Sequence, residues 1–301
     1  MKTSFTKKVT ISKLCGWFGL SRQSHYQNNN LAVAVSKTED LILTEVSKIR
    51  KKHPRMGTRK LYEKLQPIKQ EHGIKIGRDA LFTLLQINNL LCRKRKRKVY
   101  TTQSFHWLRK YPNLIKDFVP IQRNQLWVSD ITYWRVADNF IYISLITDVF
   151  SHKIVGYHVA ETLESSETIQ ALKMALTGFL NEPKSHFKLV HHSDRGVQYC
   201  QHQYVKLLKD NDIQISMTQS GDPLENAVAE RINGILKDEY LIDSKPQNFE
   251  QAKIKLIESV NAYNTDRPHM SIGNNYPQDV HEKNIKTRKL WKSYYKKKLH
   301  L

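Results

Sequence analysis

Residues 126–134, with the sequence L-W-V-S-D-I-T-Y-W, decide the fold, because apolar and polar side chains alternate along them. A period of two residues is typical of a β-strand with one face in the core. Leu126 and Val128 share a face with Asp130, so the pattern puts a carboxylate where apolar side chains are expected. Burying an unpaired charge is costly, which favours a metal ligand at Asp130 over a hydrogen-bonded buried turn residue.

The elements after this strand indicate an α/β domain. Strands are expected at residues 140–150, 153–160, 187–192 and 213–217, and helices at residues 165–180, 203–210, 227–240 and 249–263. This order predicts a mixed sheet over residues 121–282, with the topology of a ribonuclease-H-like core.

Two more acids are expected at the same end of the sheet as Asp130. Asp194 follows a predicted strand in H-H-S-D-R-G-V-Q-Y, and Glu230 lies on a predicted helix in E-N-A-V-A-E-R-I-N-G-I-L-K. Three carboxylates supply the hard oxygen ligands that two Mg²⁺ ions, or Mn²⁺ in their place, require. Asp130, Asp194 and Glu230 are therefore the predicted catalytic and metal-binding residues of a phosphoryl-transfer site.

The predicted helix at residues 227–240 carries Glu230, Gly234 and Lys237 at positions i, i+4 and i+7, on one helical face. An acid, a glycine and a cation on one stripe suit metal binding, close approach of DNA and phosphate contact. A solvated charged face with an incidental glycine is the alternative, although a helical glycine costs roughly 1 kcal/mol relative to alanine. Arg195, beside the second acid, is another predicted DNA contact.

Neighbouring polar residues are expected to be structural. Glu225 stands at or before a helix start, where a carboxylate interacts favourably with the helix dipole. Asp148 is expected in a hairpin, and His191 and His192 are expected to pack in the core or orient a neighbour rather than bind metal.

The segment Y-N-T-D-R-P-H at residues 263–269 ends the last predicted helix of the domain. It is predicted to support the active site from behind or to contact DNA, and a purely structural helix end is the alternative. The residues concerned are Tyr263, Asn264, Arg267 and His269.

The charge is divided unevenly along the chain. Residues 1–120 hold 26 Lys and Arg against 7 Asp and Glu, whereas residues 121–282 hold 15 against 21. The tail at residues 283–301 holds 8 Lys and Arg and no acid. Basic flanks around a mildly acidic middle indicate a nucleic-acid enzyme, whose flanks bind phosphates while its core keeps carboxylates for metal.

The basic N-terminal part of the 301-residue chain is expected to be helical. Residues 1–35 resemble a helix-turn-helix, or a short capping fragment, and residues 36–92 are predicted to form a small helical DNA-binding domain with exposed basic residues such as Arg59 and Lys60. Residues 93–120 are predicted to be a basic linker. Six consecutive cations there must be solvated or meet phosphate, and they are Arg93, Lys94, Arg95, Lys96, Arg97 and Lys98.

The cysteines and the apolar runs indicate the cellular compartment in which the protein is expected to work. The three cysteines are far apart with no C-x-x-C, which argues against a disulfide framework and a Cys-rich zinc site and fits a reducing cytosol. We expect no membrane partner and no signal peptide, because no apolar run approaches membrane-spanning length.

The motifs W-V-S-D-I-T-Y, H-H-S-D-R-G-V-Q-Y, E-N-A-V-A-E-R-I-N-G-I-L-K-D-E and Y-N-T-D-R-P-H together resemble the integrase catalytic core of insertion-sequence transposases of the IS-three family. Upstream, H-P-R-M-G-T-R-K-L resembles the helical domain that precedes this core. The resemblance extends from about residue 40 over nearly the whole chain and indicates the second-frame (orfB-type) product of such an element. Two features differ from the family, which usually has Asp at position 225 and a Leu soon after His269.

The resemblance implies a DNA transposase that works in the bacterial cytoplasm. Water would attack a phosphodiester at an element end, and the freed 3′-hydroxyl would then attack another phosphodiester, without a covalent protein–DNA intermediate. The implied partners are double-stranded DNA of the terminal repeats and the target, further copies of the chain assembled on that DNA, and a first-frame partner or frameshift fusion.

Two other functions compete with this interpretation. A ribonuclease-H-type nuclease would cleave without joining, and the basic flanks and Y-N-T-D-R-P-H favour the transposase over it. A DNA-binding regulator with an inactive core is opposed by the intact set of three acids. Terminal inverted repeats and an upstream overlapping reading frame in the flanking DNA would decide between them.

Overall fold

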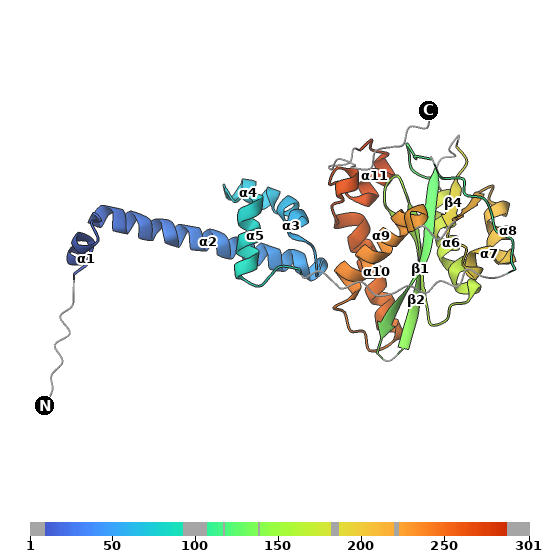
Figure 1. Ribbon diagram of the computed structural model, residues 1–301, viewed down its shortest axis with the longest axis horizontal. Coiled ribbons are helices and arrows are strands. Elements are labelled where there is room, and N and C mark those ends of the chain that lie inside the picture. Colours follow the sequence, from blue (N-terminus) through green and yellow to red (C-terminus); the bar gives the residue numbers. More distant parts are fainter. Residues whose placement is uncertain are drawn as a thin grey trace.

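The computed structural model describes residues 10–92, 107–116, 118–137, 139–181, 187–219 and 223–287. A helical region and an α/β domain follow each other along the long axis of the molecule (Figure 1). The predicted DNA contacts at residues 93–98 and most of the basic tail lie outside the described residues. Within the described part, no helix is both long and apolar enough to cross a membrane.

The helical region begins with α1 (Ile11–Trp17) and α2 (Arg22–Lys52). Gly19 makes the expected turn between them with a φ of 64°. The Ser21 hydroxyl then caps α2 by accepting a hydrogen bond from the Ser24 amide at 3.0 Å. The sequence predicted that one segment ends at residue 35 and a new helical domain begins at residue 36. Instead, α2 is one continuous helix across this boundary.

Three shorter helices complete this region: α3 (Thr58–Lys64), α4 (Gln66–Glu71) and α5 (Arg78–Ile87). They pack on the C-terminal half of α2 around a core of their own. Its buried members are Ile42, Val46, Met56, Leu61, Leu65, Ile74, Leu81, Leu84 and Leu85.

The second domain is built on a five-stranded sheet with the order β3-β2-β1-β4-β5. Pairing is antiparallel between β1 and β2 and between β2 and β3, and parallel between β1 and β4 and between β4 and β5. The strands are β1 (Leu126–Val136), β2 (Asn139–Asp148), β3 (Ile154–Ala160), β4 (Val190–Ser193) and β5 (Gln214–Met217). This mixed sheet confirms the predicted ribonuclease-H-like class, since each strand lies within a few residues of its predicted place.

Helices cover both faces of the sheet (Figure 1). One face packs against α9 (Ala227–Ile235), the π-helical segment η2 (Leu236–Leu241) and α10 (Phe249–Asp266). The other packs against α6 (Ser165–Leu180) and α8 (His202–Asp210), with α7 (Val197–Cys200) between the two. The shorter segments are η1 (Pro223–Asn226), η3 (Met270–Ile272) and α11 (Pro277–Lys283).

Two local features fix β3 in this arrangement. A Cβ on Gly156 would lie 2.2 Å from the Ala171 carbonyl oxygen, so only glycine allows α6 to pack this closely. In the hairpin before β3, the Asp148 carboxylate accepts hydrogen bonds from the Ser151 amide at 2.8 Å and its hydroxyl at 2.6 Å. Asp148 is therefore a hairpin residue, as predicted.

Candidate active site

Strand register brings the first two predicted acids together. In the parallel pair of β1 and β4, Trp127 is opposite His191 and Val128 is opposite His192. Asp194 comes directly after the end of β4. If the register continued by two residues, Asp194 would be opposite Asp130, and neighbouring strands of a sheet lie about 4.8 Å apart. Two acids that are distant in sequence thus reach the same end of the sheet.

Helix α9 brings Glu230 to the same place and is tied to β1 by two amides. Asn226 donates a hydrogen bond to the Ser129 carbonyl oxygen at 3.0 Å, and Asn233 donates one to Oδ2 of Asp130 at 2.7 Å. Sequence reasoning missed both asparagines. The available signal was spacing, since Asn233 lies three residues after Glu230 and thus on the same helical face.

The pKa of the Asp130 carboxyl is raised by its surroundings. Burial raises the pKa of its carboxyl, and Asp194 and Glu230 raise it further, to about 7, against hydrogen bonds from Asn233 and the Ile131 amide. Asp194 and Glu230 are therefore close enough to disfavour the charged form of Asp130.

The donor chemistry of this cluster fits a divalent cation, because carboxylates that repel one another gain most from a shared positive ion. Across the residues that the structure describes, however, no three His, Cys, Asp or Glu side chains are grouped closely enough to hold a metal as they stand. Oδ2 of Asp130 faces Asn233, and Oδ1 of Asp194 accepts a hydrogen bond from the Gly196 amide at 2.9 Å.

The rest of the predicted stripe is divided between α9, which carries Gly234, and η2, which carries Lys237. Lys237 donates to Thr132 Oγ1 at 3.2 Å, and its ammonium lies 4.3 Å from the centre of the Tyr133 ring. A Cβ on Gly234 would meet no atom within 4 Å, so the surface above it is open. Arg195 donates from Nε to the Thr218 carbonyl oxygen at 2.5 Å, which anchors the loop after Asp194.

The two neighbouring histidines are structural, as predicted. His191 Nε2 lies 2.7 Å from Ser129 Oγ and 3.0 Å from Tyr204 Oη, and burial lowers the pKa of His191 to about 3. His192 Nδ1 lies 2.8 Å from Ser216 Oγ, and burial lowers its pKa to about 4. Both are neutral at physiological pH and join β4 to its neighbours.

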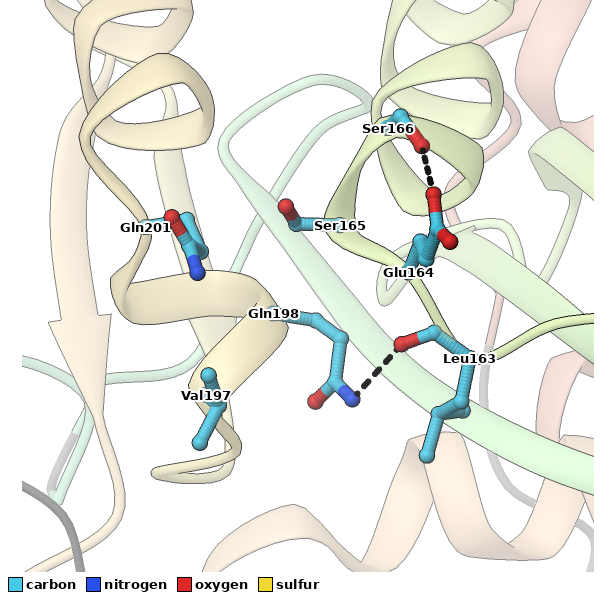
Figure 2. Close-up of a pocket in the computed structure, with 7 residues that line it drawn as sticks. All are labelled: Leu163, Glu164, Ser165, Ser166, Val197, Gln198 and Gln201. Atoms are coloured by element: carbon cyan, nitrogen blue, oxygen red, sulfur yellow. Dashed lines mark hydrogen bonds between the residues drawn. The ribbon is translucent and has the colours of Figure 1, made fainter.

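A small pocket adjoins the loop after Asp194 (Figure 2). It lies between the start of α6 and α7, where Gln198 donates to the Leu163 carbonyl oxygen at 3.1 Å. Amides and hydroxyls dominate its lining, which consists of Leu163, Glu164, Ser165, Ser166, Val197, Gln198 and Gln201.

The Y-N-T-D-R-P-H residues hold the turn between β2 and β3. Tyr263 donates to the His152 carbonyl oxygen at 3.0 Å, and the Asn264 amide bonds both backbone groups of Ile154. His269 is buried and stacks on His152 with ring centres 5.6 Å apart.

Arg267 from the same segment binds a different acid. It makes two hydrogen bonds to Glu239 on η2, both at 2.7 Å.

Two predicted DNA contacts of the helical region differ in how exposed they are. Arg59 is exposed as expected, whereas Lys60 is half-buried and donates to Glu239 at 3.1 Å.

Comparison with known proteins identifies the family of this chain. Two models of the integrase core domain match the chain, one over residues 120–223 and the other over residues 211–277. The "Insertion element IS600 uncharacterized 31 kDa protein" of Shigella sonnei is 34% identical over 274 residues, which are 90% of this chain and 98% of that protein. The chain belongs to the IS-three (IS3) family of insertion-sequence transposases. Its function is DNA transposition and integration, and its enzyme class is that of the polynucleotidyl transferases.

The chain is also similar to a second transposase and, more distantly, to a solved structure. The transposase for insertion sequence element IS629 of Shigella sonnei is 29% identical over 88% of this chain and 86% of its own length. Among solved structures, the HTLV-2 integrase catalytic core domain in complex with magnesium matches with a TM-score of 0.42 and 20% identity, over 53% of this chain and 97% of that one.

Proposed function

We propose that the chain cuts DNA at element ends and joins the freed 3′-hydroxyl to a second phosphodiester, with Asp130, Asp194 and Glu230 as its catalytic acids. The observation that carries the proposal is the junction of β1, β4 and α9. Parallel register, the Asn233 hydrogen bond and the raised pKa of Asp130 all belong to this one sheet end.

The three acids would hold two Mg²⁺ ions, or Mn²⁺ in their place, which activate the attacking oxygen and neutralise charge on the leaving one. The remaining residues have separate tasks. Asn233 orients the Asp130 carboxylate through its amide. Lys237 and Arg195 would bind phosphates on either side of the acids, and the open surface above Gly234 would admit the DNA backbone.

The helical region and its basic extensions would supply most of the DNA affinity. Residues 36–92 would bind DNA through exposed cations such as Arg59, and residues 93–98 would neutralise phosphates between the two domains. Assembly of several copies on the two ends, with a first-frame partner or a frameshift fusion, would complete the active complex.

The deciding experiment compares Glu230→Gln with Glu225→Gln on DNA that carries the element's terminal repeats. Glu230→Gln should abolish cleavage and strand transfer while DNA binding persists, because a neutral amide is a poor ligand for Mg²⁺. EDTA should do the same to the unmodified protein.

Glu225 is the matched control, since it lies in η1 before the start of α9, where Oε2 accepts a hydrogen bond from the Gln219 amide at 2.6 Å. Glu225→Gln should cost about 1 kcal/mol of stability and keep both reactions. An active Glu230→Gln variant beside an inactive Glu225→Gln variant would overturn the assignment. Cleavage without joining by the unmodified protein would point instead to a nuclease.

A further inference from the structure

A second cluster of charged side chains joins the helical region to the α/β domain, and none of them belongs to the three acids. We call it the clasp. Its members from the helical region are Lys52, His53, Arg55, Lys60 and Lys64, and its members from the α/β domain are Glu239, Tyr240, Asp266 and Arg267.

Glu239 is the centre of the clasp. The Arg267 guanidinium grips its carboxylate with two hydrogen bonds, Lys60 adds a third at 3.1 Å, and the Arg55 amide donates to its backbone oxygen at 3.2 Å. Burial opposes the charged form, yet these cations lower the pKa of Glu239 to about 2. Glu239 is therefore an ion-paired anion that is fully occupied by protein groups.

His53 provides the second connection. Its ring is buried, with Nδ1 2.8 Å from Tyr240 Oη and Nε2 2.8 Å from Oδ2 of Asp266. A carboxylate only accepts hydrogen bonds, so Nε2 carries the proton and Nδ1 accepts from the tyrosine. Lys64 also binds Asp266. One histidine thus connects the end of η2 to the end of α10.

Two members of the clasp, Glu239 and Tyr240, lie on the helical segment that continues α9, the helix that bears Glu230. Helix α9 passes directly into η2, so Glu230, Lys237 and Glu239 belong to one uninterrupted helical rod. The π-helical hydrogen bond from the Ile242 amide to the Lys237 carbonyl oxygen measures 2.9 Å.

π-Helical turns often occur at functional sites. Here η2 packs in the α/β core, and the helical region adds contacts from Lys60, the Arg55 amide and His53.

We propose that Lys60 and Glu239 are positioning residues, through which docking of the helical region orients helix α9 in the active site. This inference rests on the proposed function of Glu230. It makes the helical region part of the catalytic unit, and it assigns Lys60 to the protein's own interior rather than to DNA.

The test is steady-state strand transfer on DNA carrying the terminal repeats, with Lys60→Met in the full chain. Methionine keeps much of the apolar stem and removes only the charge. We expect kcat to fall roughly tenfold or more, since a displacement of 1 Å at a reacting group can cost about a hundredfold. The KM for DNA and the salt dependence of binding should stay unchanged, and Lys60→Arg should restore kcat.

Two further variants make the result specific. Tyr240→Phe removes the hydrogen bond to His53 from the core side and should lower kcat in the same manner. Arg59→Met, at the neighbouring exposed position, should instead weaken DNA binding and reduce the slope of log affinity against log salt by about 0.9.

The outcomes separate the two hypotheses. If Lys60→Met keeps the unmodified kcat, or if it weakens DNA binding and reduces the salt slope as Arg59→Met does, the positioning role is wrong and Lys60 is a phosphate ligand or a bystander. If Tyr240→Phe leaves kcat unchanged, the coupling through η2 is wrong. An active Glu230→Gln variant would overturn the proposed function itself, whatever Lys60→Met does.

Discussion

Two groups of acids on the same protein have opposite surroundings. At the sheet end, Asp130 faces two other acids, and burial together with their charges raises its pKa to about 7. At the clasp, Glu239 and Asp266 face lysine, arginine and histidine, which lower both pKa values to about 2 in spite of burial. The neighbours of a carboxylate therefore decide whether its charged form is favoured, as at the clasp, or disfavoured, as at Asp130.

The largest expected effect is that of Asp130→Asn. Strand transfer should fall by roughly 10⁴-fold or more, the scale on which enzymes respond to loss of one member of a catalytic unit. The metal-free protein should at the same time melt at a higher temperature, because an amide relieves the repulsion from Asp194 and Glu230. Thermal melts and strand-transfer assays on the same preparation check both signs, and a lower melting temperature would contradict the comparison.

The clasp should respond in the opposite sense. Glu239→Gln should destabilise the protein by about 2–4 kcal/mol, because it leaves the buried Arg267 guanidinium without its counter-charge. Urea denaturation measures the loss. Glu258→Gln is the matched control. The Glu258 side chain is 61% exposed and pairs with Lys255, so the substitution should change stability by less than about 1 kcal/mol. Equal effects of the two substitutions would remove the distinction between the clasp and an ordinary surface pair.

Acid pH should release the clasp. The folded pKa values of Glu239 and Asp266, about 2, lie below the usual value of about 4 for such groups. A lowered folded pKa contributes stability that is present above the unfolded value and is lost as the pH falls through the folded one. Urea midpoints should therefore decline between about pH 4 and pH 2. The decline should be shallower in Glu239→Gln, and identical slopes would exclude Glu239 as its source.

The smallest effect is expected at Gly234. Gly234→Ala should stabilise the protein by about 0.5–1 kcal/mol, because glycine is a poor residue in a helix and the added methyl meets no atom. Strand transfer should nevertheless fall roughly several-fold if DNA approaches this surface. A stabilised variant with unchanged strand transfer would show that the DNA path avoids Gly234.

The sequence predicted those features that depend on local pattern. Alternation predicted β1. The break expected in α2 is absent, and the helix runs through Asn28, Asn29 and Asn30 although asparagine has a weak helix preference.

Features that depend on distant partners were not predicted. The expected helix at residues 227–240 continued an α-helical period through η2, although the structure changes to a π-helix at Leu236. Asn226 and Asn233 carry no charge pattern that distinguishes them from surface amides. Lys60 was expected to be exposed because its partner, Glu239, lies 179 positions away.

The same distances have a consequence for how the chain folds. The helical core is local in sequence, whereas the clasp joins the two parts through residues separated by 179 positions (Lys60 and Glu239) to 214 positions (Lys52 and Asp266). Closing such long loops costs conformational entropy, and contacts between distant residues form slowly. We therefore expect the helical region to dock on the α/β domain after each has folded. During synthesis the helical region emerges from the ribosome first. Its clasp residues can bind Asp266 and Arg267 only after α10 has also emerged. If the clasp positions α9 as proposed, a nascent chain that already contains Asp130 and Asp194 would be unable to cut DNA until α10 is in place.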